Sequence, residues 1–241
     1  EREGIAHDDR PVWRAMAKGI EETYDYDVFI TYHPGWPETT VYFPNEDWLD
    51  MHALQSGHGN RTFKAWEIIR EGLKMTPRLP MMDLEPCYED HPVNAWDGNW
   101  TREGRGFFDD YDVRARTYRG VFAGGAGAAY GHGQVWQFLD TTRNHHPMWV
   151  GDTIIGWKQG VTAKGAYQLR HLKDLMLSRP DFHRVEDSTL VVSDRGEDYT
   201  DAIIATRNQK GTYAMVYLPQ SEPVDIDLDQ LKNGRKRVSW F

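Results

Sequence analysis

The stretch LPMMDLEPCYED, residues 79–90, decides the fold class of this 241-residue chain. Its first part, residues 79–84, is a short run of mostly apolar residues, which predicts a strand of a buried parallel sheet. Glu85 and Pro86 end that run. An unpaired carboxylate at the end of a buried strand costs free energy. We therefore expect Glu85 to serve a function, with an arginine-paired structural glutamate as the alternative.

Predicted strands and helices alternate on both sides of this stretch. Short β-branched, aromatic and apolar runs predict strands at 27–32, 51–56, 79–84 and 128–138. Helical spacing of apolar residues predicts helices at 11–20, 60–75, 109–122 and 162–178. This alternation is typical of a parallel α/β sheet, and four such units make half of a (β/α)8 TIM barrel.

The sequence changes in character from Asp187 onward. Short alternating runs separated by polar turns predict strands at 190–192, 202–206, 213–218 and 224–228. Such a series is typical of an antiparallel β-sandwich. We therefore expect two domains, in which residues 1–182 form part of a barrel and residues 183–241 form the start of a β-sandwich domain.

Composition narrows the classes of partner. The formal charge is −9 and the acidic residues are spread along the chain, so we expect no nucleic-acid partner. No run approaches the roughly 20 apolar residues of a membrane span. The single cysteine, Cys87, excludes an internal disulfide. Ten tryptophans on an acidic background suit a carbohydrate substrate, whose apolar faces pack on aromatic rings.

Three histidines, His33, His58 and His132, each follow a predicted strand and lie next to glycine or proline. Because the carboxyl ends of parallel strands meet at one edge of a sheet, all three could converge there and bind sugar hydroxyls. Three imidazoles and a glutamate could also bind zinc, but the spacing matches no local metal motif. We expect no metal and no cofactor, and a metal-dependent hydrolase stays open as an alternative.

Four further residues are candidates for substrate binding. Gln55 and Gln137 offer amides for hydroxyl recognition, and Trp136 offers an indole as a sugar platform, unless it belongs to the core. Tyr32 precedes His33, so its phenol either touches the carboxylate of Glu85 or points into the layer between sheet and helices.

Glu89 lies in the loop after the strand that ends at Glu85. We expect it to line the substrate site, where it orients a neighbour or binds Arg114 or Arg116 on the next predicted helix. Glu89 or Asp90 would supply the acid/base group if no upstream strand did so.

Five motifs carry a resemblance to a known family. They are YHPG (32–35), LQSGH (54–58), EPCYE (85–89), RARTYRGVFAGGAG (114–127) and YGHGQVWQF (130–138). Through these motifs the chain resembles the apiosidase-like glycoside hydrolases over most of residues 10–180. In that family a small β domain, which carries an old label of collagen binding, follows the barrel.

The resemblance implies a retaining mechanism in a (β/α)8 barrel, with the nucleophile after the seventh strand and the acid/base after the fourth. Glu85 matches the nucleophile, so the four predicted strands correspond to strands 5 to 8. The acid/base residue and the remainder of the barrel are then expected upstream of Glu1. The resemblance also favours a secreted or periplasmic protein.

The leading hypothesis is an exo-acting retaining glycosidase that acts on plant polysaccharide side chains of the pectin type, such as apiofuranosides. Glu85 would be its nucleophile. The alternatives are a non-catalytic carbohydrate-binding or inactive barrel, and a metal-dependent hydrolase that uses His33, His58 and His132.

Overall fold

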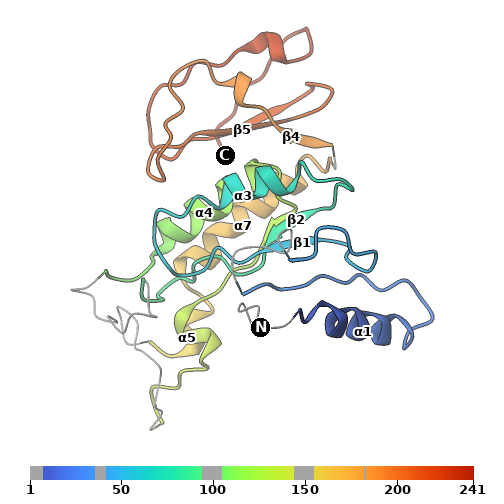
Figure 1. Cartoon of the computed structure of the whole chain (residues 1–241). Coiled ribbons are helices and arrows are strands. Elements are labelled where there is room, and N and C mark those ends of the chain that lie inside the picture. The colour runs from blue at the N-terminus through green and yellow to red at the C-terminus, as the bar shows by residue number, and fades with distance from the viewer. Residues whose placement is uncertain (1–7, 36–41, 94–104, 144–154, 182) are drawn as a thin grey trace.

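A parallel sheet lies at the centre of the molecule (Figure 1). The computed structural model describes residues 8–35, 42–93, 105–143, 155–181 and 183–241. The sheet has the order β1-β2-β3, and its strands are β1 (His52–Leu54), β2 (Met81–Asp83) and β3 (Gly127–Ala128). A parallel bridge between Thr31 and Met51 adds a fourth segment beside β1. The neighbours in the sheet therefore follow the order of the chain.

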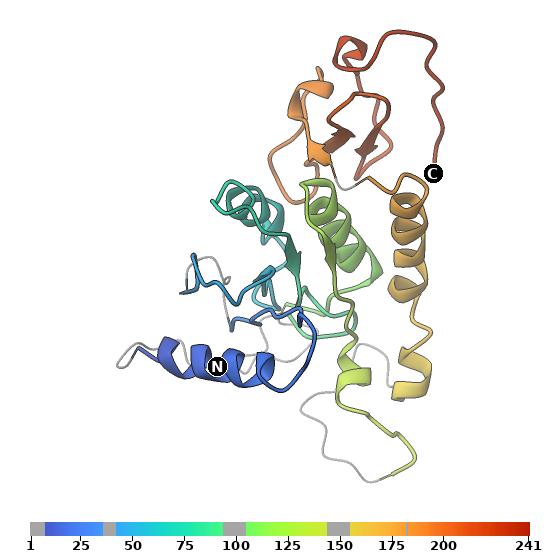
Figure 2. The same cartoon turned by 90° about the vertical axis from the view of Figure 1, so that its right-hand side faces the viewer.

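Three helices pack together beside this sheet: α3 (Ala65–Gly72), α4 (Asp110–Phe122) and α7 (Lys164–Leu177). Figures 1 and 2 both show α3 and α4 between the parallel sheet and the C-terminal sheet. Trp66 and Ile69 of α3 belong to the apolar core here. Helix formation thus follows the apolar periodicity of the sequence.

Reciprocal capping fixes the start of α4. The Asp109 carboxylate accepts a hydrogen bond from the amide of Asp112 (3.0 Å), and the Asp112 carboxylate accepts one from the amide of Asp109 (3.1 Å). These bonds satisfy amides that have no partner within the helix. The helix therefore begins at a defined residue and presents its arginines in fixed directions.

Helix α1 (Arg10–Glu21) differs from the others because it leaves an apolar stripe exposed. Val12, Met16 and Ile20 recur at intervals of one helical turn and lie in solvent, whereas Ala17 is buried. Two short helices, α5 (Gly133–Trp136) and α6 (Trp157–Gly160), follow the parallel sheet and pack on each other. Every helix in the described residues is too short or too polar to cross a membrane.

The C-terminal part forms an antiparallel sheet of order β4-β5-β6. Its strands are β4 (Arg184–Glu186), β5 (Ile204–Asn208) and β6 (Ala214–Tyr217). Two 3-10 turns, Ser188–Leu190 and Leu228–Gln230, lie beside it. A separate apolar cluster around Leu190 and Ala205 stabilises this part.

Arginines join the two sheets through α3 and α4. Arg119 of α4 is fully buried, donates to the carbonyl of Ala202 (3.0 Å) and lies over the rings of Trp66, Tyr199 and Tyr217. A further charged pair joins α3 to β4. The C-terminal sheet is therefore packed on the helical layer through buried, specific contacts.

The predicted helices at 11–20, 60–75, 109–122 and 162–178 are confirmed as elements, with bounds that differ at their ends. The strands predicted at 51–56 and 79–84 are confirmed as β1 and β2. The run at 27–32 forms only a bridge at Thr31.

The predicted strand at 128–138 is wrong over most of its length. The strand ends at Ala128, and α5 begins at Gly133, because the side chain of His132 caps the amide of Gln134 (3.1 Å). The strand at 190–192 is also wrong, since a 3-10 turn and a bridge from Val191 to Ile226 occupy it. The predicted strand at 224–228 forms only the Ile226 end of that bridge before the 3-10 turn at Leu228. The strands expected at 202–206 and 213–218 are found as β5 and β6, whereas β4 was not predicted.

Candidate active site

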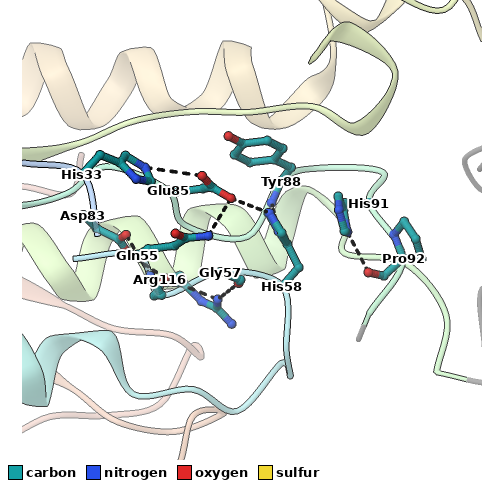
Figure 3. A network of polar contacts seen from close by, with 11 residues as sticks. His33, Gln55, Gly57, His58, Asp83, Glu85, Tyr88, His91, Pro92 and Arg116 are labelled. Carbon is teal, nitrogen blue, oxygen red and sulfur yellow. Dashed lines mark hydrogen bonds and ion pairs between the residues drawn. The ribbon is translucent and has the colours of Figure 1, made fainter. Parts of the chain in front are cut away.

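Glu85 lies two residues after the end of β2, at the carboxyl end of the parallel sheet. Its carboxylate is about one quarter exposed and contacts three side chains, as Figure 3 shows. Oε1 lies 2.9 Å from Nε2 of Gln55 and 3.3 Å from Nε2 of His58, and Oε2 lies 3.4 Å from Nε2 of His33. No arginine or lysine in the described residues forms an ion pair with it. Within the described residues, the contacts of Glu85 therefore differ from those of an arginine-paired structural residue.

Neighbouring parallel segments bring these side chains together. His33 follows the bridge at Thr31, Gln55 follows β1, and Glu85 follows β2. A bond from the amide of Gly57 to the carbonyl of Glu85 (2.8 Å) joins the loops after β1 and β2. Residues far apart in sequence therefore converge at one edge of the sheet, where open and closed α/β folds place their ligands.

Competing effects set the pKa of Glu85. Burial of the carboxyl acts to raise its pKa, but the hydrogen bonds and charges of His58, His33 and Gln55 outweigh burial and hold the pKa below its usual value of 4.5. Glu85 is therefore an anion at neutral pH. An ionised carboxylate, partly accessible and held by donors of modest strength, can attack an electrophilic carbon.

His58 is held on several sides. Its Nδ1 accepts a hydrogen bond from the amide of Tyr88 (3.4 Å), and the rings of Tyr88 and His58 pack edge to face. His91 stacks on it with the ring centroids 3.8 Å apart. Tyr88 and His91 were not predicted from the sequence as site residues. Their position three and six residues after Glu85, within the same loop, is the signal that could have found them.

A buried polar network supports the loop that carries His58. Arg116 of α4 donates to the carbonyls of Gly57 (2.8 Å) and Asn60 (2.8 Å). Asp83 of β2 accepts from the hydroxyl of Ser56 (2.6 Å), and Figure 3 shows Asp83 and Arg116 on the opposite side of the loop from Glu85. Complete burial raises the pKa of Asp83 to about 6, although Ser56 and Arg116 act to lower it.

Glu89 has structural partners. Its Oε2 accepts hydrogen bonds from the hydroxyl of Tyr130 (2.7 Å) and from the amide of Gly165 (2.9 Å). Burial and the bond to Glu89 raise the pKa of Tyr130. The expected contact of Glu89 with Arg114 or Arg116 is wrong, because Arg114 pairs with Asp110, and Arg116 holds the His58 loop. Glu89 therefore ties the loop after β2 to the start of α7.

The remaining candidates lie in other settings. The ring of Tyr32 packs between the rings of Trp13 (4.9 Å between centroids) and Phe43 (4.8 Å). These contacts agree with a side chain that is packed between elements of the fold. Gln137 donates to the carbonyl of Gly133 (2.8 Å). Trp136 is 46% exposed, so its interpretation as a core residue is wrong.

His132 is buried and caps α5 through its Nδ1. Glu85 thus contacts both His33 and His58, whereas His132 caps the start of α5. Among the residues that the structure describes, no group of three or more His, Cys, Asp or Glu side chains is arranged to hold a metal ion. The convergence that would favour a metal-dependent hydrolase is not seen for these three histidines.

Solved structures show the class to which this fold belongs. The chain is similar to a glycoside hydrolase family 5 protein from Bacteroides vulgatus ATCC 8482, with a TM-score of 0.81 and 31% identity over 92% of this chain and 48% of that one. It is similar also to a second structure described as a glycoside hydrolase, with a TM-score of 0.80 and 30% identity over 91% of this chain and 50% of the other. The chain therefore has an α/β fold of the glycoside hydrolase type, and it spans about half the length of these two proteins.

Family models give the more specific assignment. The model described as "Apiosidase-like, catalytic domain" matches residues 2–183, and the chain belongs to this family. The model described as "Putative collagen-binding domain of a collagenase" matches residues 185–241. The predicted resemblance is thereby confirmed. A comparison with curated proteins gives no match.

Proposed function

We propose that the chain carries the nucleophile of a retaining glycosidase, and that this nucleophile is Glu85. The observation that supports the proposal is the setting of the carboxylate. It is ionised and partly exposed at the carboxyl edge of a parallel sheet, and its partners are two histidines and an amide. The setting differs from that of Glu186, a carboxylate that pairs with the guanidinium of Arg70 between α3 and β4.

Glycoside hydrolysis with retention requires a second carboxyl group about 5 to 5.5 Å from the nucleophile. Two nearby carboxylates have other partners, because Asp83 is buried against Ser56 and Glu89 is bound by Tyr130 and Gly165. We therefore place the acid/base group on the remainder of a (β/α)8 barrel, expected upstream of Glu1. The segment at Thr31, β1, β2 and β3 would then be strands 5 to 8.

Two observations support a larger barrel. The two similar glycoside hydrolases are about twice as long as this chain while nearly all of it matches them. The stripe of Val12, Met16 and Ile20 on α1 leaves apolar area in solvent that a neighbouring β/α unit would bury. On this proposal residues 1–182 belong to the barrel and residues 183–241 begin the C-terminal β domain.

Family membership supports the proposed substrate class. We propose exo-acting hydrolysis of side chains on plant polysaccharides of the pectin type, with apiofuranosides as the first substrates to test. His33, about one third exposed, and Gln55 border the carboxylate and are placed to bind the hydroxyls of the sugar at the cleavage point.

Removal of the carboxylate tests the proposal. The polypeptide that contains this chain and the rest of the barrel would be assayed on aryl glycosides, apiofuranosides among them, as the parent, Glu85→Gln and Glu71→Gln. Glu71 lies exposed on α3 and is the matched control. We expect Glu85→Gln to lose at least about a thousandfold in kcat, as nucleophile removal does in other enzymes, and Glu71→Gln to match the parent.

Azide rescue separates the nucleophile from an acid/base residue. In Glu85→Ala, azide would enter from the side that the carboxylate has left, and the glycosyl azide would have the inverted configuration. An azide product of retained configuration would assign Glu85 to acid/base catalysis. Turnover in Glu85→Gln equal to the parent would refute the proposal, and saturable oligosaccharide binding without turnover in the parent would indicate a carbohydrate-binding barrel instead.

A further inference from the structure

We propose that His91 is a positioning residue that keeps the ring of His58 oriented as a hydrogen-bond donor to Glu85. The inference rests on the proposed function in one respect, because it takes Glu85 as the reacting group. The residue acts through His58, and its ring does not touch the carboxylate in Figure 3.

The first observation is the stacking of the His58 and His91 rings. The imidazoles of His58 and His91 are stacked with centroids 3.8 Å apart and planes inclined by 20°. His91 is itself anchored, since its Nδ1 lies 2.7 Å from the carbonyl oxygen of Pro92. Both histidines are almost completely buried. A ring that is fixed in a packed interior restricts the plane of the ring stacked on it.

Hydrogen bonds to the edge of His58 determine its tautomer. The amide of Tyr88 can only donate, so Nδ1 of His58 accepts and carries no proton in the neutral ring. The proton then resides on Nε2, which lies 3.3 Å from Oε1 of Glu85. Rotation of the ring about its Cβ–Cγ bond would break both contacts. The stack with His91 opposes that rotation.

The charge state of His91 is consistent with this role. Burial and the neighbouring His58 lower the pKa of His91 to about 3, although the carbonyl of Pro92 acts to raise it. The stacked ring is therefore neutral near pH 7. It adds no positive charge beside the donor, and Nδ1 of His91 donates its proton to the carbonyl of Pro92.

Two substitutions of similar volume test the contribution of the flat ring. His91→Phe keeps an aromatic ring for stacking, and His91→Leu fills the space without one. The complete polypeptide would be labelled with [15N]histidine, and the His58 ring nitrogens would be assigned by their loss in His58→Gln. Long-range 1H–15N correlations then report the tautomer directly. His52→Leu, at a buried histidine of β1, is the control for loss of core packing.

We expect the parent and His91→Phe to show an unprotonated Nδ1 and a protonated Nε2 at His58. His91→Leu should show averaged ring nitrogens and a fall in kcat of about tenfold to a hundredfold with little change in KM, as small displacements of positioned groups cause. His52→Leu should leave the His58 signals unchanged.

Three results would overturn the proposal. They are a parent His58 protonated on Nδ1, a His91→Leu protein with the ring signals and kcat of the parent, and a control that shifts His58 as strongly as His91→Leu. Failure of the proposed function is recognised separately. In that case Glu85→Gln retains turnover, whereas the spectrum of His58 still reports on the stack.

Discussion

Replacement of Arg116 by lysine tests whether the network behind the His58 loop controls both stability and the site. Arg116 is 1% exposed and uses two nitrogens to bind the carbonyls of Gly57 and Asn60, each at 2.8 Å. Lysine keeps the positive charge but has one ammonium group on a flexible stem. Its single nitrogen cannot reproduce the two-nitrogen fork of arginine, so we expect one of the two carbonyls to lose its bond.

The size of the effect follows from the bonds that are lost. One charge-assisted hydrogen bond to a buried carbonyl contributes about 1.5–3 kcal/mol. The guanidinium of Arg116 also lies over the ring of Phe108, with its carbon 5.6 Å from the ring centroid, a contact that contributes about 0.5–2 kcal/mol. We therefore expect Arg116→Lys to lower the free energy of unfolding by about 2–5 kcal/mol.

A second effect concerns activity. Because the loop from Gly57 to Asn60 carries His58, loss of one anchor should shift the donor to Glu85 and reduce kcat/KM by about tenfold to a hundredfold. Urea unfolding and steady-state kinetics would be measured for Arg116→Lys and for Arg114→Lys. Arg114 lies on the same helix but is 30% exposed in its pair with Asp110, so its replacement should cost less than about 1 kcal/mol.

Equal losses of stability in the two lysine variants would show that the buried guanidinium of Arg116 contributes no more to stability than the partly exposed one of Arg114. A stable Arg116→Lys protein with the kcat/KM of the parent would refute the link from the network to the site. A loss of stability alone, with parental kinetics in the folded fraction, would confine Arg116 to a structural role.

Three further predictions use the same region. Folding raises the pKa of Asp83 from 3.8 to about 6, so the stability contributed by its protonated form is fully present below pH 3.8 and is lost as pH rises through 6. The free energy of unfolding of Asp83→Asn, measured in urea, should therefore rise by up to about 3 kcal/mol relative to that of the parent between pH 4 and 7. A difference that stays constant with pH would contradict this prediction. In Gly131→Ala the new Cβ would lie 2.1 Å from the Tyr88 ring, so the free energy of unfolding should fall by about 1–3 kcal/mol. Gly19 has open space around it, so Gly19→Ala is the control and should be neutral or stabilising. If Glu85 must be ionised for activity, the midpoint of the acid limb of kcat/KM should lie below pH 4.5, because the pKa of Glu85 is lowered from that value. A midpoint above pH 5 in the pH–rate profile would assign the limb to another group.

Periodicity made the helices and the central strands predictable. The apolar spacing in α3 is a local property of the sequence, and the structure confirms the helix that it predicts. The strand predicted at 128–138 is wrong because apolar and aromatic content alone does not determine the conformation of this segment. The actual conformation depends on the His132 cap and on the close approach of Gly133 to the backbone of Asp90, which no local pattern reveals.

The candidate site was predictable in part for a related reason. His33, Gln55 and Glu85 follow consecutive parallel segments, so the topology alone predicts that they meet, as their contacts in the structure show. The partners of Glu89 and the environment of Tyr32 depend on side-chain packing between elements. His91 was missed because its proposed role lies in a ring stack with His58, and stacking leaves no signature in sequence spacing.

Helix α4 connects the site to the C-terminal sheet. Arg116 holds the loop of His58, and Arg119, one turn further along, is enclosed by the rings of Trp66, Tyr199 and Tyr217 and bonded to the carbonyl of Ala202. A displacement of the C-terminal sheet would expose this guanidinium cage and remove the constraint on α4 from that side. Both arginines are buried on one rigid helix, so a movement at Arg119 would be transmitted to Arg116. The C-terminal sheet therefore belongs to the framework that fixes the His58 loop.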